Sequence, residues 1–334
     1  MNKVLCFLTI FILSASAVFA AVIGQTDEST RIGGGARPVG MGRAFVAVSD
    51  DSDAIFINPA GSAGMKGPQA MAMFTNILND VYYTEFCGAV PSEWGVFGMG
   101  YIATGVNDVP TTPEASDYYD GMLVLSYSSS LARFFEYSKN VYFGSTIKLF
   151  SRGWSGGVND YGSGWSSDFG IKYIYSPYLS FGLVRQNFVP VSLGSKLTFQ
   201  TGVEESVSGS TNIGVAYRTN LLKDSLLFSL EADLPSYSGQ QGTEHAGVEW
   251  KLNDYIAIRG GSSQYVDADS PTGTSWNPSY GISFGYLNLR VDYAYITRYN
   301  DPAQTTHYLS LSYSGEPWLA LKGETAPLNE TPSR

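Results

Sequence analysis

The chain has 334 residues and a formal net charge of −10 at neutral pH. This acidic balance argues against nucleic acid as a partner, because binding to phosphates requires a basic face. Beyond the N-terminus, no stretch approaches the roughly eighteen consecutive apolar residues of a membrane-spanning helix, which excludes a helical membrane protein.

The first twenty residues, MNKVLCFLTIFILSASAVFA, predict a secretory signal peptide. A lysine precedes an apolar core from Val4 to Leu13, and small residues suited to cleavage end at Ala20. A retained anchor helix is the alternative, but the apolar run falls short of the ~20 residues that a membrane span needs. Cleavage would remove Cys6 and leave Cys87 alone, so we expect neither a disulfide nor a cysteine-based metal site.

Residues 21–67 differ from the rest of the chain because they do not alternate and are rich in glycine and acidic residues. Glycines at positions 33, 34, 35, 40 and 42 permit backbone conformations that other residues avoid. The sequence NPAG predicts a turn in which Pro59 fixes φ and Gly61 is free to adopt a positive φ. The segment is therefore unlike a strand.

Residues 68–314 alternate between apolar and polar side chains with a period of two. In LNLRVDYAYITR, for example, Leu289, Val291 and Tyr293 share one face, and Arg290 and Asp292 share the other. The segments are longer than the five or six residues usual in a soluble sandwich, and they match the 9–11 residues or so of a tilted strand crossing a bilayer. We therefore expect an all-β, antiparallel outer-membrane barrel, with a secreted sandwich or propeller as the alternative.

Fourteen segments carry this pattern, an even number that suits closure of an antiparallel barrel with both termini on one side. Short connections after every second strand alternate with mostly long ones rich in Gly, Asp, Thr and Pro, so we place both termini in the periplasm. Residues 194–205 are assigned to an outer loop although they could form a strand, and SSLARFFEYSK is long enough for a short interfacial helix. Aromatic residues near strand ends suggest interfacial girdles: Tyr82, Tyr83, Trp94, Tyr101 and Tyr119. The expected strands are 68–78, 81–90, 94–103, 119–129, 139–151, 165–175, 179–189, 209–219, 224–234, 243–252, 255–264, 277–287, 288–298 and 305–314.

A barrel of this size encloses more space than wall side chains fill, since eight strands are already just filled by them. Many inward positions are small, including Gly214, Ala216, Gly247, Ser283 and Gly285. Others are charged, and besides Lys148 the expected lumenal charges are Arg218, Glu231, Asp233, Glu249, Arg259, Arg290 and Asp292. We therefore expect residues 21–67 to fold into the lumen as a compact hatch, or plug.

The stretch GARPVGMGRAFVAVSDDSDAIFINPAGSAGM resembles the N-terminal signature of the FadL superfamily of outer-membrane proteins, and most of all its PorV (PorV/PorQ) branch. Later stretches such as FGLVRQNFVP, GVEWKLNDYIAIRGG and THYLSLSY resemble the same branch. The resemblance implies a fourteen-stranded barrel with an N-terminal hatch. The hatch motif comprises Gly40, Met41, Gly42, Ala44, Phe45, Asp50, Asp51, Asn58, Pro59, Ala60 and Gly61.

The resemblance implies two functions. FadL-type proteins pass fatty-acid-like hydrophobic molecules across the outer membrane, and PorV-type proteins act in type IX secretion, where the partners are secreted proteins or secretion subunits. Either role places the chain in the outer membrane of a Gram-negative-type bacterium, in contact with its lipid. Residues 315–334 continue beyond the last strand, and we expect them to form an exposed periplasmic extension.

Catalytic, nucleotide and metal sites are weaker interpretations, and we expect no enzyme activity, cofactor or metal. A serine hydrolase would need a histidine as base, but His245 opens a strand and His307 lies with the outward set. The sequence GMGRAF lacks the preceding strand and following lysine of a phosphate loop. Asp50, Asp51 and Asp53 lack the spacing of a known calcium loop, so a helix start or ion pairs with lumenal arginines are the favoured interpretation.

Overall fold

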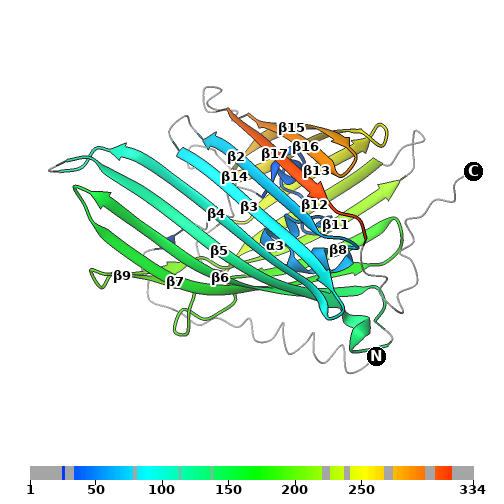
Figure 1. Ribbon diagram of the computed structural model, residues 1–334, viewed down its shortest axis with the longest axis horizontal. Helices are drawn as coiled ribbons and strands as arrows, with labels where there is room; N and C mark the ends of the chain where they lie inside the picture. The colour runs from blue at the N-terminus through cyan, green and yellow to red at the C-terminus, as the bar shows by residue number, and fades with distance from the viewer. Residues whose placement is uncertain are drawn as a thin grey trace, which may run out of the picture.

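The computed structural model describes residues 25–26, 34–77, 81–112, 114–136, 138–219, 226–236, 241–266, 274–297 and 305–317. The expected signal peptide and nearly all of the C-terminal extension lie outside these residues. Among the described residues, no helix has the length and apolar character needed to cross a membrane. Fourteen main strands form the wall (Figure 1), namely β2 (Gln69–Ile77), β3 (Val81–Ser92), β4 (Gly95–Val109), β5 (Ser116–Ser130), β6 (Val141–Gly156), β7 (Asp160–Ile174), β8 (Leu179–Gln186), β11 (Ser210–Thr219), β12 (Leu226–Pro235), β13 (Thr243–Lys251), β14 (Ile256–Val266), β15 (Thr274–Tyr286), β16 (Leu289–Ile296) and β17 (Thr306–Ser314).

The wall is closed. Each main strand pairs antiparallel with its neighbours in sequence, β8 pairs with β11 across residues 187–209, and β17 returns to pair with β2. Closure leaves neither the first nor the last strand with an unpaired edge, which an open sheet would expose. The predicted all-β antiparallel barrel of about fourteen strands is therefore confirmed.

Most connections at one end of the barrel are shorter than those at the other, although residues 131–140 form a longer connection at the first end and residues 157–159 a short one at the second. We call the ends the short-turn end, which carries residues 252–255 and 287–288, and the long-connection end. Much of the expected long loop between β4 and β5 is strand, and only residues 110–115 connect them. A register shift between Val106 and Val109 accommodates this extension, and the rings of Tyr118 and Trp154 pack 4.9 Å apart across the next pair of strands. The hairpins of β4–β7 therefore project at the left of Figure 1.

Residues 187–209 depart from the regular wall. β7 pairs with β8 along its later half and with β9 (Lys196–Phe199) along its earlier half, and β10 (Glu204–Val207) pairs with β9. The short strand β1 (Gln25–Thr26) pairs in parallel with β10. The segment expected as an outer loop at 194–205 is therefore a small hairpin that extends the sheet beside β7. The expected interfacial helix is a single 3₁₀ turn, η3 (Leu131–Arg133).

The outer face of the wall is apolar and the inner face is largely polar. On β12, Phe228, Leu230 and Leu234 are exposed, whereas the alternate residues Ser229 and Glu231 are buried. Large exposed apolar side chains follow the same alternation on the other strands of the wall. In water this belt would be an unusually large hydrophobic patch, and its geometry matches the lipid-facing band of an outer-membrane barrel.

One expected girdle residue faces the opposite way. Trp94 is exposed at the turn between β3 and β4, as a girdle residue should be, but Tyr83 is fully buried and donates a hydrogen bond to Glu85 at 3.1 Å. The expectation for Tyr83 was wrong because strand alternation, and not nearness to the strand end, decides which face a side chain occupies.

Residues 34–64, which we call the inner segment, lie within the barrel (Figure 1). They form three short helical turns, α2 (Ala36–Gly40), α3 (Ala54–Ile57) and η2 (Pro59–Gly64), joined by irregular backbone. Most of their side chains are buried, including Val39, Phe45 and Ile55. Positive φ angles at Gly35 and Gly42 allow the sharp reversals on either side of α2.

A belt of wall glycines lets the inner segment approach the strands. At each, an added Cβ would lie between 2.2 and 3.2 Å from an atom of the inner segment, closer than side-chain carbons normally approach. Several are direct cross-strand partners, such as Gly247 and Gly261. The wall is therefore shaped for this segment, in the way that glycine marks close backbone approach in strands. The glycine belt consists of Gly98, Gly100, Gly144, Gly170, Gly182, Gly214, Gly247, Gly261 and Gly281.

The lipid-facing belt generates a first prediction. Leu230→Arg, in the middle of β12, should lower the free energy of unfolding by about 2–4 kcal/mol, because a charge would enter the centre of the bilayer. Leu234→Arg, on the same face but near the strand end, should cost only about 0–1 kcal/mol. Urea unfolding in lipid vesicles measures both values. Equal costs at the two positions would contradict this placement of the strand in the membrane.

The glycine belt generates a second prediction. Gly261→Ala should destabilise the folded barrel by about 1–3 kcal/mol, because its Cβ would overpack Met41 and Gly42. The adjacent Gly260 is the matched control, since an added Cβ there meets only Val248, at 3.9 Å. Gly260→Ala should leave the free energy of unfolding nearly unchanged. The same unfolding assay compares the two variants, and indistinguishable values would argue against close packing of the inner segment.

Candidate functional site

Arg37 is the centre of the contact between the inner segment and the wall. It lies on α2 and is buried, and its guanidinium donates two hydrogen bonds to Glu249, at 2.9 and 3.0 Å. Its remaining nitrogen donates to Asp51 at 2.8 Å and to Asp50. The guanidinium carbon also lies 5.0 Å from the centre of the Phe45 ring. A single side chain thus joins three parts of the inner segment to β13.

The ion pairs continue through the wall and return to the inner segment. Arg259 donates to Glu249 at 2.6 Å and to Asp292 at 3.1 Å, and Arg290 donates to Asp292 at 2.7 Å and to Asp51 at 3.2 Å. Three guanidinium groups and three carboxylates balance one another, so no buried charge in this set lacks an opposite partner. We call this set the charge ring, and its order is Arg37, Glu249, Arg259, Asp292, Arg290 and Asp51.

Opposite charges of the inner segment and of the wall keep Arg37 and Asp50 ionised. Burial opposes the charged form of Arg37, but Asp50, Glu249 and Asp51 outweigh this effect and raise its pKa well above the usual value. Burial likewise acts to raise the pKa of Asp50, yet the Arg37 guanidinium and Lys172 hold that pKa well below its ordinary range. Arg218, on the inward face of β11, contributes to the same lowering.

Glu231 of β12 and His245 of β13 contact the backbone of the inner segment. Glu231 accepts hydrogen bonds from the amides of Phe45 and Val46, both at 2.8 Å. His245 lies 3.1 Å from the carbonyl of Gly42 through Nδ1 and 3.2 Å from Asp233 through Nε2. Because both ring nitrogens are engaged in this way, His245 is not placed as a base beside a serine.

His307 and Lys172 contact opposite sides of the wall: His307 lies at the outer face, and Lys172 binds the inner segment. His307 is exposed on the outer face, 2.6 Å from the Tyr293 hydroxyl. Lys172 is buried and donates to the carbonyls of Val48 and Ser49 at 2.6 and 2.9 Å. The two histidines thus lie on opposite faces of the wall.

The NPAG sequence forms the second anchor of the inner segment. Asn58 accepts a hydrogen bond from the amide of Ala60 and so caps η2, and its side-chain nitrogen donates to the carbonyls of Val46 and Ile171. The predicted turn is therefore the first turn of a 3₁₀ helix, with Pro59 at its start. Gly61 does not adopt a positive φ, and it is needed because an added Cβ would lie 2.1 Å from the Ser49 carbonyl.

The structure brings many of the sequence-predicted residues together. Glu249, Arg259, Arg290 and Asp292 meet Asp51 in the charge ring, whereas Glu231 and Asp233 lie apart from it. In the hatch motif, Met41, Ala44 and Phe45 are buried and Gly40 lies against the backbone of Gly281. Sequence reasoning did not single out three contacts at this interface, Arg37, Lys172 and Glu85, and it weighed His245 only as a catalytic base.

A set of buried apolar side chains, which we call the apolar cluster, continues from the inner segment toward the long-connection end. Ile55 and Phe56 of α3 pack over the glycines of β4, next to the inward-facing Ile102. Ile102 is the cross-strand partner of Met122, which in turn is the partner of Phe150. The cluster continues to the hairpin beside β7, through Leu197 and Phe199. The interior beside the inner segment is therefore largely hydrophobic on this side of the barrel.

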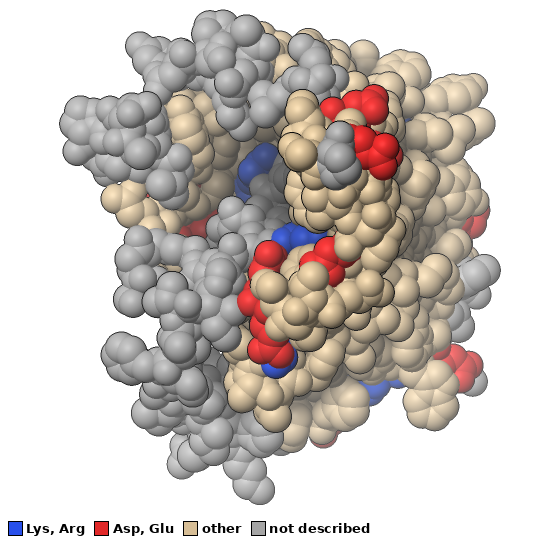
Figure 2. All heavy atoms as spheres, turned by 90° about the vertical axis from the view of Figure 1, so that its left-hand side faces the viewer, with Lys and Arg blue, Asp and Glu red and all other residues tan. Residues whose placement is uncertain are grey.

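Figure 2 shows the molecule from the long-connection end, where the surface is hollowed between the strands. Acidic side chains gather at the rim of the hollow, and basic ones lie deeper. At this end Arg152 pairs with Asp120 at 2.8 Å and with Glu205 at 3.3 Å, and Lys196 pairs with Glu204 at 2.6 Å. Charged groups therefore line part of the hollow at this end.

The charge ring generates a third prediction. Arg37→Met should lower the free energy of unfolding by about 3–5 kcal/mol, because Glu249 and Asp51 would remain buried with a partner removed. Adding Glu249→Gln should cost less than the sum of the two single changes, by about 0.5–3 kcal/mol. A double-mutant cycle by urea unfolding measures this coupling. Strict additivity would show that the two side chains do not interact.

No family model and no curated protein matches the sequence. Solved structures do share its fold. The CymD monoaromatic hydrocarbon channel matches with a TM-score of 0.58 and 12% identity over 85% of this chain and 98% of that chain. The toluene transporter TbuX of Ralstonia pickettii matches with a TM-score of 0.54 and 12% identity, over 85% and 99% of the two chains. A FadL homologue of Pseudomonas aeruginosa matches with a TM-score of 0.53 and 12% identity, over 82% and 97%.

Identities at this level establish the fold and not the cargo. The resemblance to the FadL superfamily is therefore confirmed for the architecture, whereas assignment to the PorV branch stays a prediction. Together with the apolar outer belt and the closed wall, these similarities show that the chain has the β-barrel fold of the FadL homologue and of the hydrocarbon channels.

Proposed function

We propose that this protein is a passive channel for hydrophobic small molecules across the outer membrane, and that the inner segment is its hatch. The observation that carries the proposal is the apolar cluster, which links the inner segment at Ile55 and Phe56 to Phe150 and Phe199 near the long-connection end. Each methylene group that enters such surroundings from water gains about 0.8 kcal/mol, so an apolar interior favours alkyl or aromatic cargo over polar solutes.

The printed descriptions of the structural neighbours favour the same class of cargo. CymD is described as a monoaromatic hydrocarbon channel and TbuX as a toluene transporter. These neighbours give no support to the alternative role in type IX secretion. We infer transport of a fatty-acid-like or aromatic molecule, without a chemical step and without a cofactor.

The hatch role is supported by how the inner segment is held. Its contacts with the wall combine ion pairs at Arg37 and backbone hydrogen bonds at Glu231 and Asn58 with close packing against the glycine belt. Such contacts are specific enough to define one closed arrangement, and polar enough for water to replace them during a movement. In this proposal, cargo reaches the apolar cluster from the long-connection end, and a shift of the inner segment completes the path.

The fourth prediction tests the transport function. Met122→Gln places a polar amide in the apolar cluster and should reduce uptake of a radiolabelled long-chain fatty acid or toluene several-fold, because the cargo would lose apolar contacts. Leu125→Gln, on the outward face of the same strand, is the matched control and should leave uptake unchanged. Uptake is measured in proteoliposomes after gel mobility has shown that each variant is folded. Wild-type uptake no faster than that of protein-free liposomes would overturn the proposal.

A further inference from the structure

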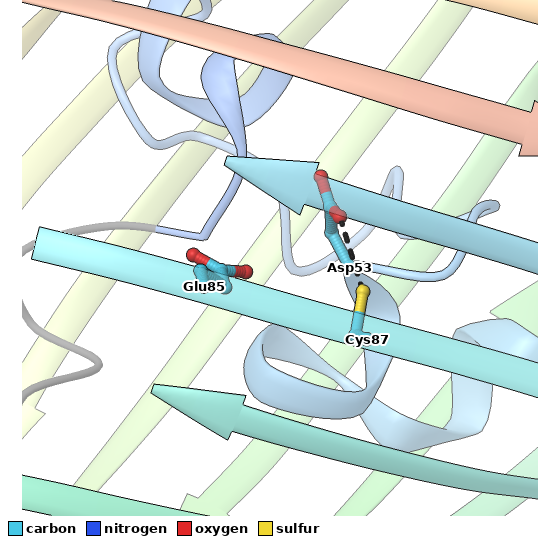
Figure 3. A group of neighbouring side chains, drawn as sticks. All are labelled: Asp53, Glu85 and Cys87. Carbon is cyan, nitrogen blue, oxygen red and sulfur yellow. Dashed lines mark hydrogen bonds between the residues drawn. The ribbon is translucent and has the colours of Figure 1, made fainter. Parts of the chain in front are cut away.

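Three side chains that take no part in the charge ring meet where the inner segment faces β3. Asp53 comes from the inner segment, and Glu85 and Cys87 come from the inward face of β3 (Figure 3). All three are buried, and one potential ligand atom from each lies within 4.8 Å of those of the other two. The Cys87 sulfur lies 3.7 Å from Asp53 Oδ1. Two carboxyl groups and a thiol thus converge on one point.

The hydrogen bonds of this cluster are incomplete. Glu85 Oε2 accepts from the Gly35 amide and from the Tyr83 hydroxyl, but among the residues that the structure describes the fully buried Oε1 has no hydrogen-bond partner. Figure 3 shows one of the two Glu85 oxygens pointing along β3 toward Cys87 and Asp53. Asp53 occupies the N-cap position of α3, yet its side chain makes no capping hydrogen bond. Buried acceptors without donors are uncommon, and an unrecorded ion is one of the explanations for them.

The groups around the cluster are mainly acidic, so a bound cation would balance their charge. The carboxylates of Asp51, Glu85 and Asp292 all act electrostatically on Asp53, and Arg290 opposes them. Asp51 and Arg290 are already paired within the charge ring. The cluster can therefore be neutralised either by protons or by a bound cation.

We propose that Asp53, Glu85 and Cys87 bind a divalent transition-metal ion, best represented by Zn²⁺, which ties the inner segment to the barrel wall. A thiolate together with carboxylate oxygens suits zinc better than magnesium or calcium, which take oxygen ligands alone. Tetrahedral ligands at about 2.0–2.3 Å from zinc lie ~3.3–3.8 Å apart, so small side-chain movements would close the present spacing. Three protein ligands leave a fourth position for water.

This site would act as a metal-dependent latch, and it does not depend on which cargo the barrel carries. Asp53 lies directly before α3, whose Ile55 and Phe56 form the inner end of the apolar cluster. Zinc bound at Asp53 and β3 would therefore hold α3 in its closed position. Chelation would free α3 while leaving the charge ring in place.

The fifth prediction tests the site directly, with ZnCl₂ as the probe. The full-length barrel, extracted in mild detergent, is stripped with a chelator, equilibrated with ZnCl₂ and desalted, and zinc per chain is measured by mass spectrometry. We expect about one zinc per chain in the wild type and an at least tenfold weaker affinity in Cys87→Ser and in Asp53→Asn. Glu244→Gln, at an exposed carboxylate of β13, is the control and should bind as the wild type does.

Cobalt substitution gives a second readout that folding defects cannot imitate. Co²⁺ bound by the wild type should show a thiolate-to-cobalt absorption band that is absent from the Cys87→Ser protein. Equal zinc content in wild type and Cys87→Ser, with both folded on a heat-modifiability gel, would overturn the site and assign protons to the cluster. Fatty-acid uptake that persists in that case would leave the transport proposal standing.

Discussion

The arrangement of the barrel interior depends on the charge ring. Arg37 must leave water to enter the lumen, and burying a guanidinium is costly unless opposite charges await it. Glu249 and Asp51 provide them, and Arg259 on β14 and Arg290 and Asp292 on β16 complete the balance. The inner segment therefore has one position in which all six charges are satisfied. A displaced segment would leave several buried charges without partners.

The shape of the wall favours the same position of the inner segment as the charge ring does. The glycine belt removes side chains where the backbone of the inner segment would otherwise collide with the wall, and the helical turns follow this groove from Gly40 to Pro59. Fourteen strands enclose more volume than their own side chains fill, so a barrel of this size needs either water or a folded segment inside. The inner segment therefore fills part of the lumen and packs closely against the wall.

The two halves of that interior differ in character. The charge ring gathers on β13–β16, and the apolar cluster lies mainly on β2–β6 and on the hairpin beside β7. The cluster of Asp53, Glu85 and Cys87 lies on the apolar side, where the start of α3 meets β3. A movement of α3 would open the apolar side while the ionic side kept the rest of the segment in place. This division gives a physical basis for a hatch that moves in part and is not expelled as a whole.

The sequence by itself determined the strands and their faces, because the side-chain period of two is local and each face has its own solvent. It therefore predicted the number of strands, the inward set of charges and the non-strand character of the N-terminal segment. It could not predict which charges would pair, since Arg37 and Glu249 are 212 residues apart and meet only when the barrel closes. Tyr83 and Cys87 likewise became buried only when the barrel closed around the inner segment. The hairpin at 194–205 forms because β9 pairs with β7. Local periodicity fixes the wall, whereas contacts within the lumen are decided by tertiary structure, because they join segments that no local pattern connects.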